Sequence, residues 1–356
     1  MGGAMRMECS TTRSYDVALS SDVLDPDNPV LAEVAGSKRG LVILDSCLEA
    51  EHGPRLKHYL ATRLPGFETR TLVLSEHAKS IETVMEICAT AQAMGLGRQD
   101  LLVAVGGGIC CDLVSVAASL IRRGVPYVTV PTTLLAQVDA GIALKGGVNF
   151  GGSKNYLGCF RPPAAVLVDP MFLLTVHRAD LVSGMAEMLK IGLVRDAQLV
   201  AELRAHGPLL ASTGFAEPAG VGFRLIGRSI ELMLGELAAN PYEERGLRRL
   251  VDFGHTFSGR LEEASAYALR HGEAVALDMA LSSAIALETG HLTGASLVEI
   301  LTTLLELDLP VSSDLATQSN LVEAIAATAN HRAGALNLVV PAGIGTATFL
   351  PSVTDV

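Results

Sequence analysis

Three side chains that lie far apart in the sequence have the chemistry to bind one divalent metal ion. Glu187 falls in a helical segment, and His255 and His271 each adjoin a glycine that would let backbone or ligand approach closely. Two imidazoles and one carboxylate are a typical set of catalytic zinc ligands and leave one coordination position open. Because the spacing does not join them, a hydrogen-bonded structural role for either histidine stays open.

Lys190 follows Glu187 by one helical turn, so the two side chains are predicted to lie on the same helix face. Met, Leu and Ile residues surround the pair and indicate a buried setting. A buried lysine needs a partner, and a substrate phosphate would serve. The alternative is an exposed ion pair with Glu187.

More cationic and amide groups precede this helix. Lys145, Lys154 and Asn155 lie in a glycine-rich stretch, and Arg123 comes shortly before it. Each lysine by itself could be a solvated loop charge. Together with Arg123 and Lys190, the lysines could form a cluster of basic residues. Lys190 is the last lysine of the chain, so any phosphate-binding lysine must come from the first half or its edge.

A run of three glycines, Gly106, Gly107 and Gly108, follows an apolar run and opens a helical pattern. Consecutive glycines let the backbone approach a pyrophosphate, and a helix N-terminus offers free N–H groups. The run differs from the GxGxxG of a standard dinucleotide turn, so a tight turn without ligand would also explain it. Other polar groups follow predicted strands, where ligands bind in parallel sheets, and these are Asp45, Glu76, Lys79, Thr132 and Thr133.

Alternating strand and helix patterns must position these residues. Short apolar runs that predict strands occupy residues 40–45, 71–74, 101–105 and 127–131. Helical periodicity between them spans 81–94 and 112–122. Such alternation indicates a parallel sheet that is covered on both faces.

The second half of the chain has a different texture. Residues 136–175 are glycine-rich and polar, and we expect them to be loop-like. Helical patterns then fill 181–194, 223–237, 273–289 and 297–306. The chain therefore predicts a Rossmann-like α/β, dinucleotide-binding domain at 1–176 and an all-α, metal- and substrate-binding domain at 177–356.

Composition limits the class of protein. Of the 356 residues, 49% are hydrophobic and 18% charged, which excludes a disordered chain, and the net charge of −11 without a basic patch argues against a nucleic-acid partner. The apolar stretch 101–121 contains three glycines and Asp112, so it predicts a buried strand, turn and helix rather than a membrane span. Six cysteines without a CxxC pair, and an N-terminus without a signal-peptide pattern, predict a cytoplasmic protein with reduced thiols.

From about residue 15 to 350 the chain resembles the dehydroquinate synthase-like sugar phosphate cyclases. The resemblance rests on an ordered series of motifs: Gly106-Gly107-Gly108 with Asp112, Arg123-Gly124-Val125, Pro131-Thr132-Thr133, Gln137-Val138-Asp139, Lys154-Asn155, Gly184-Met185-Ala186-Glu187 with Lys190, Gly254-His255-Thr256-Phe257, and His271-Gly272-Glu273-Ala274. It implies NAD on the glycine turn and Zn²⁺ or Co²⁺ on Glu187, His255 and His271. It also implies an active site between the domains of a homodimer.

The resemblance extends to individual site residues. It implies catalytic or substrate-binding roles for Lys145, Lys154, Asn155, Lys190, Arg248, Asp252 and Arg123, of which Arg123 would reach the neighbouring subunit's site. The predicted cofactor-binding set is Asp45, Glu76, Lys79, Gly106, Gly107, Gly108, Asp112, Thr132, Thr133, Asp139, Lys145, Lys154 and Thr175.

Two departures indicate the branch. Dehydroquinate synthase has Asn in place of Asp252 and a second His in place of Gly259, and it binds a carboxylated sugar phosphate with extra lysines that this chain lacks. Four segments resemble the 2-epi-5-epi-valiolone synthases, namely Val148–Asn155, Asn240–Glu243, Val251–Ser258 and His331-Arg332. The resemblance implies that the chain cyclises sedoheptulose 7-phosphate by transient NAD-dependent oxidation, phosphate elimination, reduction, ring opening and aldol closure. That branch usually has Pro in place of Gly259, so a 2-epi-valiolone or related cyclitol synthase stays open. A 3-dehydroquinate synthase, a metal-dependent polyol dehydrogenase and a non-catalytic binding protein stay open as well.

Overall fold

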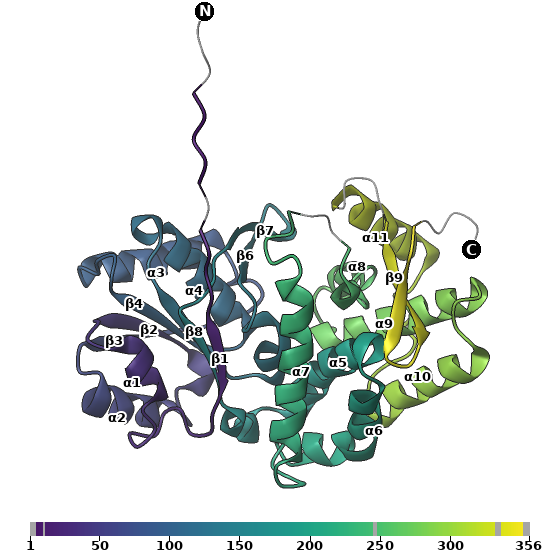
Figure 1. Ribbon diagram of the computed structural model, residues 1–356, viewed down its shortest axis with the longest axis horizontal. Helices are drawn as coiled ribbons and strands as arrows, with labels where there is room; N and C mark the ends of the chain where they lie inside the picture. Colours follow the sequence, from purple (N-terminus) through teal and green to yellow (C-terminus); the bar gives the residue numbers. More distant parts are fainter. Residues whose placement is uncertain (1–4, 10, 245–247, 332–335, 352–356) are drawn as a thin grey trace, which may run out of the picture.

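The computed structural model describes residues 5–9, 11–244, 248–331 and 336–351. In Figure 1 a sheet with its covering helices forms one side of the molecule, and a helical part forms the other. The sheet has six parallel strands in the order β1-β8-β5-β4-β2-β3. Their bounds are β1 (Asp16–Leu19), β2 (Gly40–Asp45), β3 (Phe67–Leu72), β4 (Leu101–Gly106), β5 (Tyr127–Pro131) and β8 (Ala165–Val168).

The sheet is buried on both faces, as the apolar runs predict. On β4, Val103 and Val105 face one core, and Leu102 and Ala104 face the other. Four helices contribute to these two cores, namely α1 (Val30–Ala35), α2 (Gly53–Arg63), α3 (Ile81–Ala93) and α4 (Gly108–Leu120). The predicted strand 71–74 is displaced, because β3 ends at Leu72. Helix α4 begins directly at the glycine turn, earlier than the predicted 112.

The loop-like character predicted for residues 136–175 is wrong in part. Besides β8, the segment forms an antiparallel hairpin of β6 (Lys145–Phe150) and β7 (Ser153–Phe160) that packs on α4. Glycine is depleted in strands in general, which is why the sequence suggested a loop. Here the glycines permit close packing, since a Cβ at Gly146 would lie 2.7 Å from Ser115 and one at Gly158 would lie 2.6 Å from a backbone oxygen.

The C-terminal part is helical, which confirms the predicted fold class. Its helices are α5 (Arg178–Arg195), α6 (Ala197–Ser212), α7 (Val221–Ala238), α8 (Ser258–Ala264), α9 (His271–Glu288), α10 (Gly294–Glu306) and α11 (Gln318–His331). The predicted helical segments did not include α6, α8 and α11, nor a small hairpin of β9 (Leu338–Gly343) and β10 (Thr346–Leu350). The predicted domain division at residue 176 falls between β8 and α5 and stays a prediction.

Helix α5 lies at the centre of the helical part and carries the first candidate metal ligand. Every residue from Leu181 to Val194 is buried, and α5 packs against α6, α7 and α9. Such a helix places its few polar side chains in the interior, where they need charged or hydrogen-bonding partners. Within the part of the chain that the structure describes, no helix is both long and apolar enough to span a membrane.

Candidate metal and dinucleotide site

The fold brings the three predicted metal ligands together. Glu187 comes from α5, His255 from the loop before α8, and His271 is the first residue of α9. One possible ligand atom from each lies within 4.8 Å of the others. The Nε2 atoms of His271 and His255 lie 3.2 Å and 3.9 Å from Oε1 of Glu187. A divalent ion could therefore be held by one carboxylate and two imidazole nitrogens.

The other ring nitrogen of each histidine meets an oxygen. Nδ1 of His271 lies 2.9 Å from Oε1 of Glu262, and Nδ1 of His255 lies 3.2 Å from the carbonyl oxygen of Phe253. With Nδ1 as the donor, each Nε2 lone pair is free to face Glu187, which is the arrangement found in metal-binding histidines. Glu262, on α8, is a site residue that the sequence did not reveal, because no spacing connects it to His271.

The charges at this cluster depend strongly on burial. Burial disfavours an ionised Glu187, but the adjacent Lys190 and His271 outweigh it and hold the pKa of that carboxyl well below its usual range. Burial and the nearby Lys190 lower the pKa of His255 to about 4. Burial opposes charge on His271 too, yet its contacts with Glu187 and Glu262 raise its pKa to about 9. A metal ion would displace the proton of His271.

Lys190 is buried as predicted, and its partners are carboxylates. It forms an ion pair with Glu187, and its Nζ lies 3.5 Å from Oδ2 of Asp139. Asp139 belongs to η3 (Ala136–Ala140), a turn of π-helix between β5 and β6. Burial raises the pKa of Asp139 to about 6 against the opposing charge of Lys190. Lys190 thus connects a predicted cofactor residue with a predicted metal ligand.

The glycine turn joins β4 to α4 at the carboxyl end of the sheet. Gly107 is the N-cap of α4 and has no side chain to cap it, so the first N–H groups of the helix are free of a side-chain partner. A Cβ at Gly106 would lie 2.6 Å from that of Cys110, so a larger residue would disturb the turn. A free helix N-terminus beside a tight glycine turn suits a phosphate group.

Three predicted cofactor residues flank this turn. An added Cβ at Gly106 would lie 3.2 Å from Asp45, and one at Gly107 would lie 3.3 Å from Thr133. The backbone N–H of Thr132 donates to the carbonyl of Gly106 at 3.0 Å. The ends of β2, β4 and β5 therefore meet here, as expected for neighbouring parallel strands.

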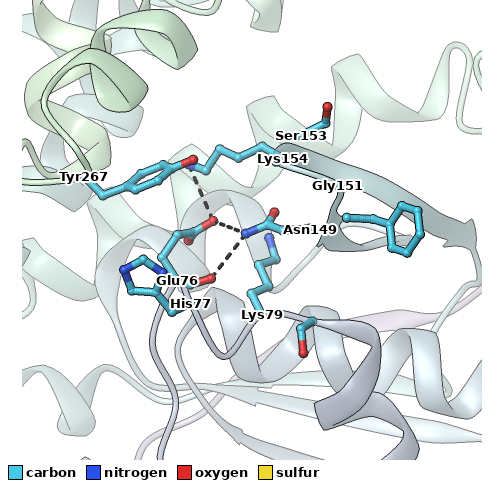
Figure 2. A pocket seen from close by; sticks show the side chains of 11 residues that line it. Glu76, His77, Lys79, Asn149, Gly151, Ser153, Lys154 and Tyr267 are labelled. Atoms are coloured by element: carbon cyan, nitrogen blue, oxygen red, sulfur yellow. Dashed lines mark hydrogen bonds and ion pairs between the residues drawn. The ribbon is translucent and has the colours of Figure 1, made fainter.

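The hairpin β6–β7 gathers another group of predicted residues. Nζ of Lys79 lies 2.6 Å from Oδ2 of Asp112 and 2.6 Å from Oδ1 of Asn155. Asn149 donates to Oε1 of Glu76 at 2.8 Å, as Figure 2 shows. Asn149 thereby holds the loop that carries Glu76. The sequence indicated a basic region here but did not indicate this role of Asn149.

A cavity of about 440 Å³ connects the glycine turn with the metal cluster. Its lining includes Gly108 and Asp112 from the first turns of α4 together with His255 and His271 from the metal cluster. Its remaining lining residues include Glu76, Lys79, Asp139, Lys154, Asn155, Glu262 and Tyr267. A second cavity of about 290 Å³ shares Glu76, Lys79, Lys154 and Tyr267 and opens beside the tip of the hairpin (Figure 2).

A chain of ion pairs holds the remaining predicted residues near this region. Lys145, the first residue of β6, pairs with Glu243. Arg249 pairs with Glu243 as well, and its Nη2 lies 2.6 Å from Oδ1 of Asp252. Glu243 and Arg249 were not predicted as site residues. Their signal was weak, because charged residues are common throughout this segment.

Three predicted residues lie elsewhere. The guanidinium of Arg248 is exposed and stacks over the ring of Phe349, 4.6 Å from its centroid. Arg123 is exposed beyond the C-terminal end of α4, opposite to the glycine turn. The hydroxyl of Thr175 pairs with Nε2 of His52 at 2.8 Å. The roles predicted for these three residues stay predictions.

The parallel sheet, the uncapped glycine turn and the Glu-His-His cluster on one cavity define a class of protein. It consists of an α/β nucleotide-binding fold joined to a helical, metal-binding part. Two family models match the chain, namely 3-dehydroquinate synthase N-terminal at residues 70–183 and 3-dehydroquinate synthase C-terminal at 184–330. The chain therefore belongs to the 3-dehydroquinate synthase-like family of sugar phosphate cyclases, which confirms the resemblance seen in its motifs.

Individual relatives refine this placement. The chain is 41% identical to the 2-epi-5-epi-valiolone synthase of Streptomyces hygroscopicus subsp. jinggangensis, over 99% of this chain and 87% of that protein. It is 33% identical to the 3-dehydroquinate synthase of Paracoccus denitrificans, over 96% of this chain and 94% of that protein. A solved structure of the Streptomyces synthase, with NAD⁺ and Zn²⁺ bound, superposes with a TM-score of 0.94 and covers 98% of this chain and 96% of that chain.

Proposed function

We propose that this protein converts sedoheptulose 7-phosphate into 2-epi-5-epi-valiolone and inorganic phosphate, with NAD and Zn²⁺ or Co²⁺ as cofactors. The observation that carries the proposal is the single cavity lined by both the glycine turn and the metal cluster. Such a cavity places a dinucleotide next to a Lewis acid. The 41% identity to a synthase of this activity, over nearly the whole chain, supports the choice of reaction.

The residues of this chain fit both cofactors. Both carboxylate oxygens of Glu187 are fully buried and lack a hydrogen bond of standard geometry, although Lys190 and His271 lie near them. An ion held by Glu187, His255 and His271 would satisfy them. When bound, NAD would supply reversible hydride transfer, and the metal ion would polarise the oxygen of the hydroxyl group that is converted to a ketone.

Cationic and amide side chains would orient the substrate. Lys154 and Asn155 line the cavity. Lys190 lies next to the cavity, because its Nζ is 3.5 Å from Oδ2 of the lining residue Asp139. Their donors would hold the phosphate and the hydroxyls and would stabilise negative charge as it develops on oxygen. Asp252 would accept a hydrogen bond from a substrate hydroxyl. The leaving phosphate can act as its own base, so the chain need not supply a strong one.

The charge of the cavity favours a substrate without a carboxylate. Among the described lining residues, the permanent cations are Lys79 and Lys154, and each already has an acidic partner. A carboxylated sugar phosphate would bring one more negative charge without a matching cation. This argument supports sedoheptulose 7-phosphate over the substrate of 3-dehydroquinate synthase.

One observation keeps a second product in view. A Cβ added at Gly259 would meet no described atom within 4 Å, so there is open space at the position where the branch usually has proline. Gly259 itself is exposed and is not among the residues that line the cavity, so this second product is supported by the sequence departure alone. The second candidate is therefore a 2-epi-valiolone synthase, which shares every step before aldol closure.

The test is incubation of the purified protein with sedoheptulose 7-phosphate, NAD⁺ and Zn²⁺ or Co²⁺, followed by NMR of the product. We expect 2-epi-5-epi-valiolone and one equivalent of phosphate. A product that is the other epimer would assign the second candidate. Turnover of the carboxylated sugar phosphate alone would overturn both and identify a 3-dehydroquinate synthase.

We further propose that the enzyme is a carbon–oxygen lyase that acts in the cytoplasm as a homodimer with domains at 1–176 and 177–356. Arg123 is exposed, so in such a dimer its side chain is available to reach the partner's cavity. Six free cysteines support a reducing compartment. Light scattering after size exclusion would test the dimer, and Arg123→Ala should lower turnover without separating the subunits.

A further inference from the structure

Glu262 contacts the metal cluster and the hairpin β6–β7 at the same time. One oxygen, Oε1, lies 2.9 Å from Nδ1 of His271, and the other, Oε2, lies 2.5 Å from Nζ of Lys154. Its side chain is 6% exposed, so the carboxylate is largely withdrawn from water. His271 comes from α9, Glu262 from α8 and Lys154 from β7, so this one side chain joins three elements.

Lys154 is held from other directions as well. Its Nζ lies 3.8 Å from Oε1 of Glu76 and 5.3 Å from the centre of the Tyr267 ring, as Figure 2 shows for the three side chains. Glu262 is nevertheless its nearest acidic partner. A displacement of Glu262 would therefore remove a hydrogen-bonding partner from both Lys154 and His271.

We propose that Glu262 is a positioning residue that fixes the Nδ1–H form of His271 for metal binding and couples this ligand to Lys154. The inference rests on the metal centre of the proposed function. A carboxylate that accepts from Nδ1–H orients the ring and makes Nε2 a better ligand. Because the same carboxylate also binds Lys154, it holds both the metal ligand His271 and the hairpin β6–β7 in place.

Two substitutions of Glu262 differ in the contacts that they remove. In Glu262→Gln one amide oxygen can still accept a hydrogen bond, but the NH₂ group cannot accept from a second donor. Either His271 or Lys154 then loses its partner. Glu262→Ala removes both contacts. The neighbouring Glu263 is exposed on the same helix and pairs with Arg260, so Glu263→Gln is a matched control.

The experiment measures zinc affinity of the metal-free full chain by competition with a chromogenic chelator. Glu262→Ala should weaken zinc binding roughly 10- to 100-fold, the usual effect of losing an outer carboxylate, and Glu262→Gln should weaken it less where its amide oxygen keeps the bond to His271. Glu263→Gln should stay within about twofold of the parent protein. Circular dichroism of the metal-free variants confirms that each one folds. Zinc affinity of Glu262→Ala within about twofold of the parent would overturn the proposal.

A double-mutant cycle tests the coupling to Lys154. Lys154→Met should change zinc affinity in the parent protein and should change it less in the Glu262→Gln background, because the shared carboxylate is already altered. Additive effects would overturn the coupling. His271→Ala separates this inference from the proposed function: if that variant still binds zinc like the parent, the metal centre itself is wrong. If it loses zinc while Glu262→Ala retains full affinity, only the role of Glu262 is wrong.

Discussion

Lys190 and Glu187 form an ion pair in the interior of α5, with 2% and 0% of their side chains exposed. The helix around them is buried from Leu181 to Val194. Buried charges are stable only when they are compensated, and here Asp139 and His271 complete the compensation. Because Glu187 is also a candidate metal ligand, the charge balance of this pair should make the stability of the protein depend on whether the metal site is occupied.

Lys190→Met should reveal this link. It leaves Glu187 without its cation, which should lower the free energy of unfolding by about 3–5 kcal/mol in the metal-free protein. Zinc should then stabilise the variant more than it stabilises the parent, since the ion replaces the missing charge. Thermal unfolding with and without zinc measures both effects. An equal zinc-induced shift in both proteins would contradict the prediction.

His271→Ala and Glu187→Ala should each abolish zinc retention and phosphate release together, because each removes one of three ligands. Zinc content by mass spectrometry and phosphate release from sedoheptulose 7-phosphate are the measurements. His291→Ala is the control, because His291 is exposed and pairs with Thr289 outside the cluster. Full activity in either ligand variant would refute the assignment.

NAD should be regenerated within each catalytic cycle. With NAD⁺ at a concentration far below that of sedoheptulose 7-phosphate, phosphate release should continue until the sugar is consumed. The concentration of NADH, followed by its absorbance, should not rise above that of the enzyme. Stoichiometric NADH would instead indicate a polyol dehydrogenase.

Arg249 and Arg248 should differ in their effect on stability. Arg249 pairs with Asp252 and Glu243 and its side chain is 17% exposed, so Arg249→Met removes the cation beside Asp252 and leaves Glu243 with Lys145 alone. We expect a loss of roughly 1–3 kcal/mol, against less than about 0.5 kcal/mol for the exposed Arg248→Met. Urea denaturation decides between them. KM for the sugar phosphate, measured on the same variants, tests the substrate-binding role predicted for Arg248.

Asp278 should make stability depend on pH. Burial raises its pKa from 3.8 to about 6, against hydrogen bonds from the N–H groups of Phe257 and Ser258. Between these values the folded protein keeps a proton that the unfolded chain releases, so stability falls as pH rises, by up to about 3 kcal/mol. Asp278→Asn has no proton to lose, and its stability relative to the parent should increase across this window. Parallel stability curves for the two proteins would contradict the prediction.

Much of the fold could be predicted because its signals are local. The apolar run of β4 and the glycines after it specify a buried strand that ends in a tight turn. The one-turn spacing of Glu187 and Lys190 places both on one face of a helix. The hairpin β6–β7 was missed because its glycines weaken the strand signal, and their value appears only when α4 packs against them.

The site was predictable in its residue types and less so in its connections. Glu262 is an ordinary helix residue in the sequence and becomes a partner of His271 and Lys154 only through the packing of α8. Arg248 and Arg249 are adjacent and chemically identical, and the local backbone directs one to Phe349 and the other to Asp252.

The sequence by itself indicated four of the six parallel strands, the helical character of the second half, and Glu187, His255 and His271 as side chains with metal-binding chemistry. Periodicity and side-chain type are properties of short segments, so they survive without knowledge of the fold. The tertiary structure alone decided that these three ligands meet, that Glu262 supports one of them, and that the glycine turn opens on the same cavity. Contacts between distant segments depend on how whole helices and strands pack, and local sequence patterns do not encode that packing.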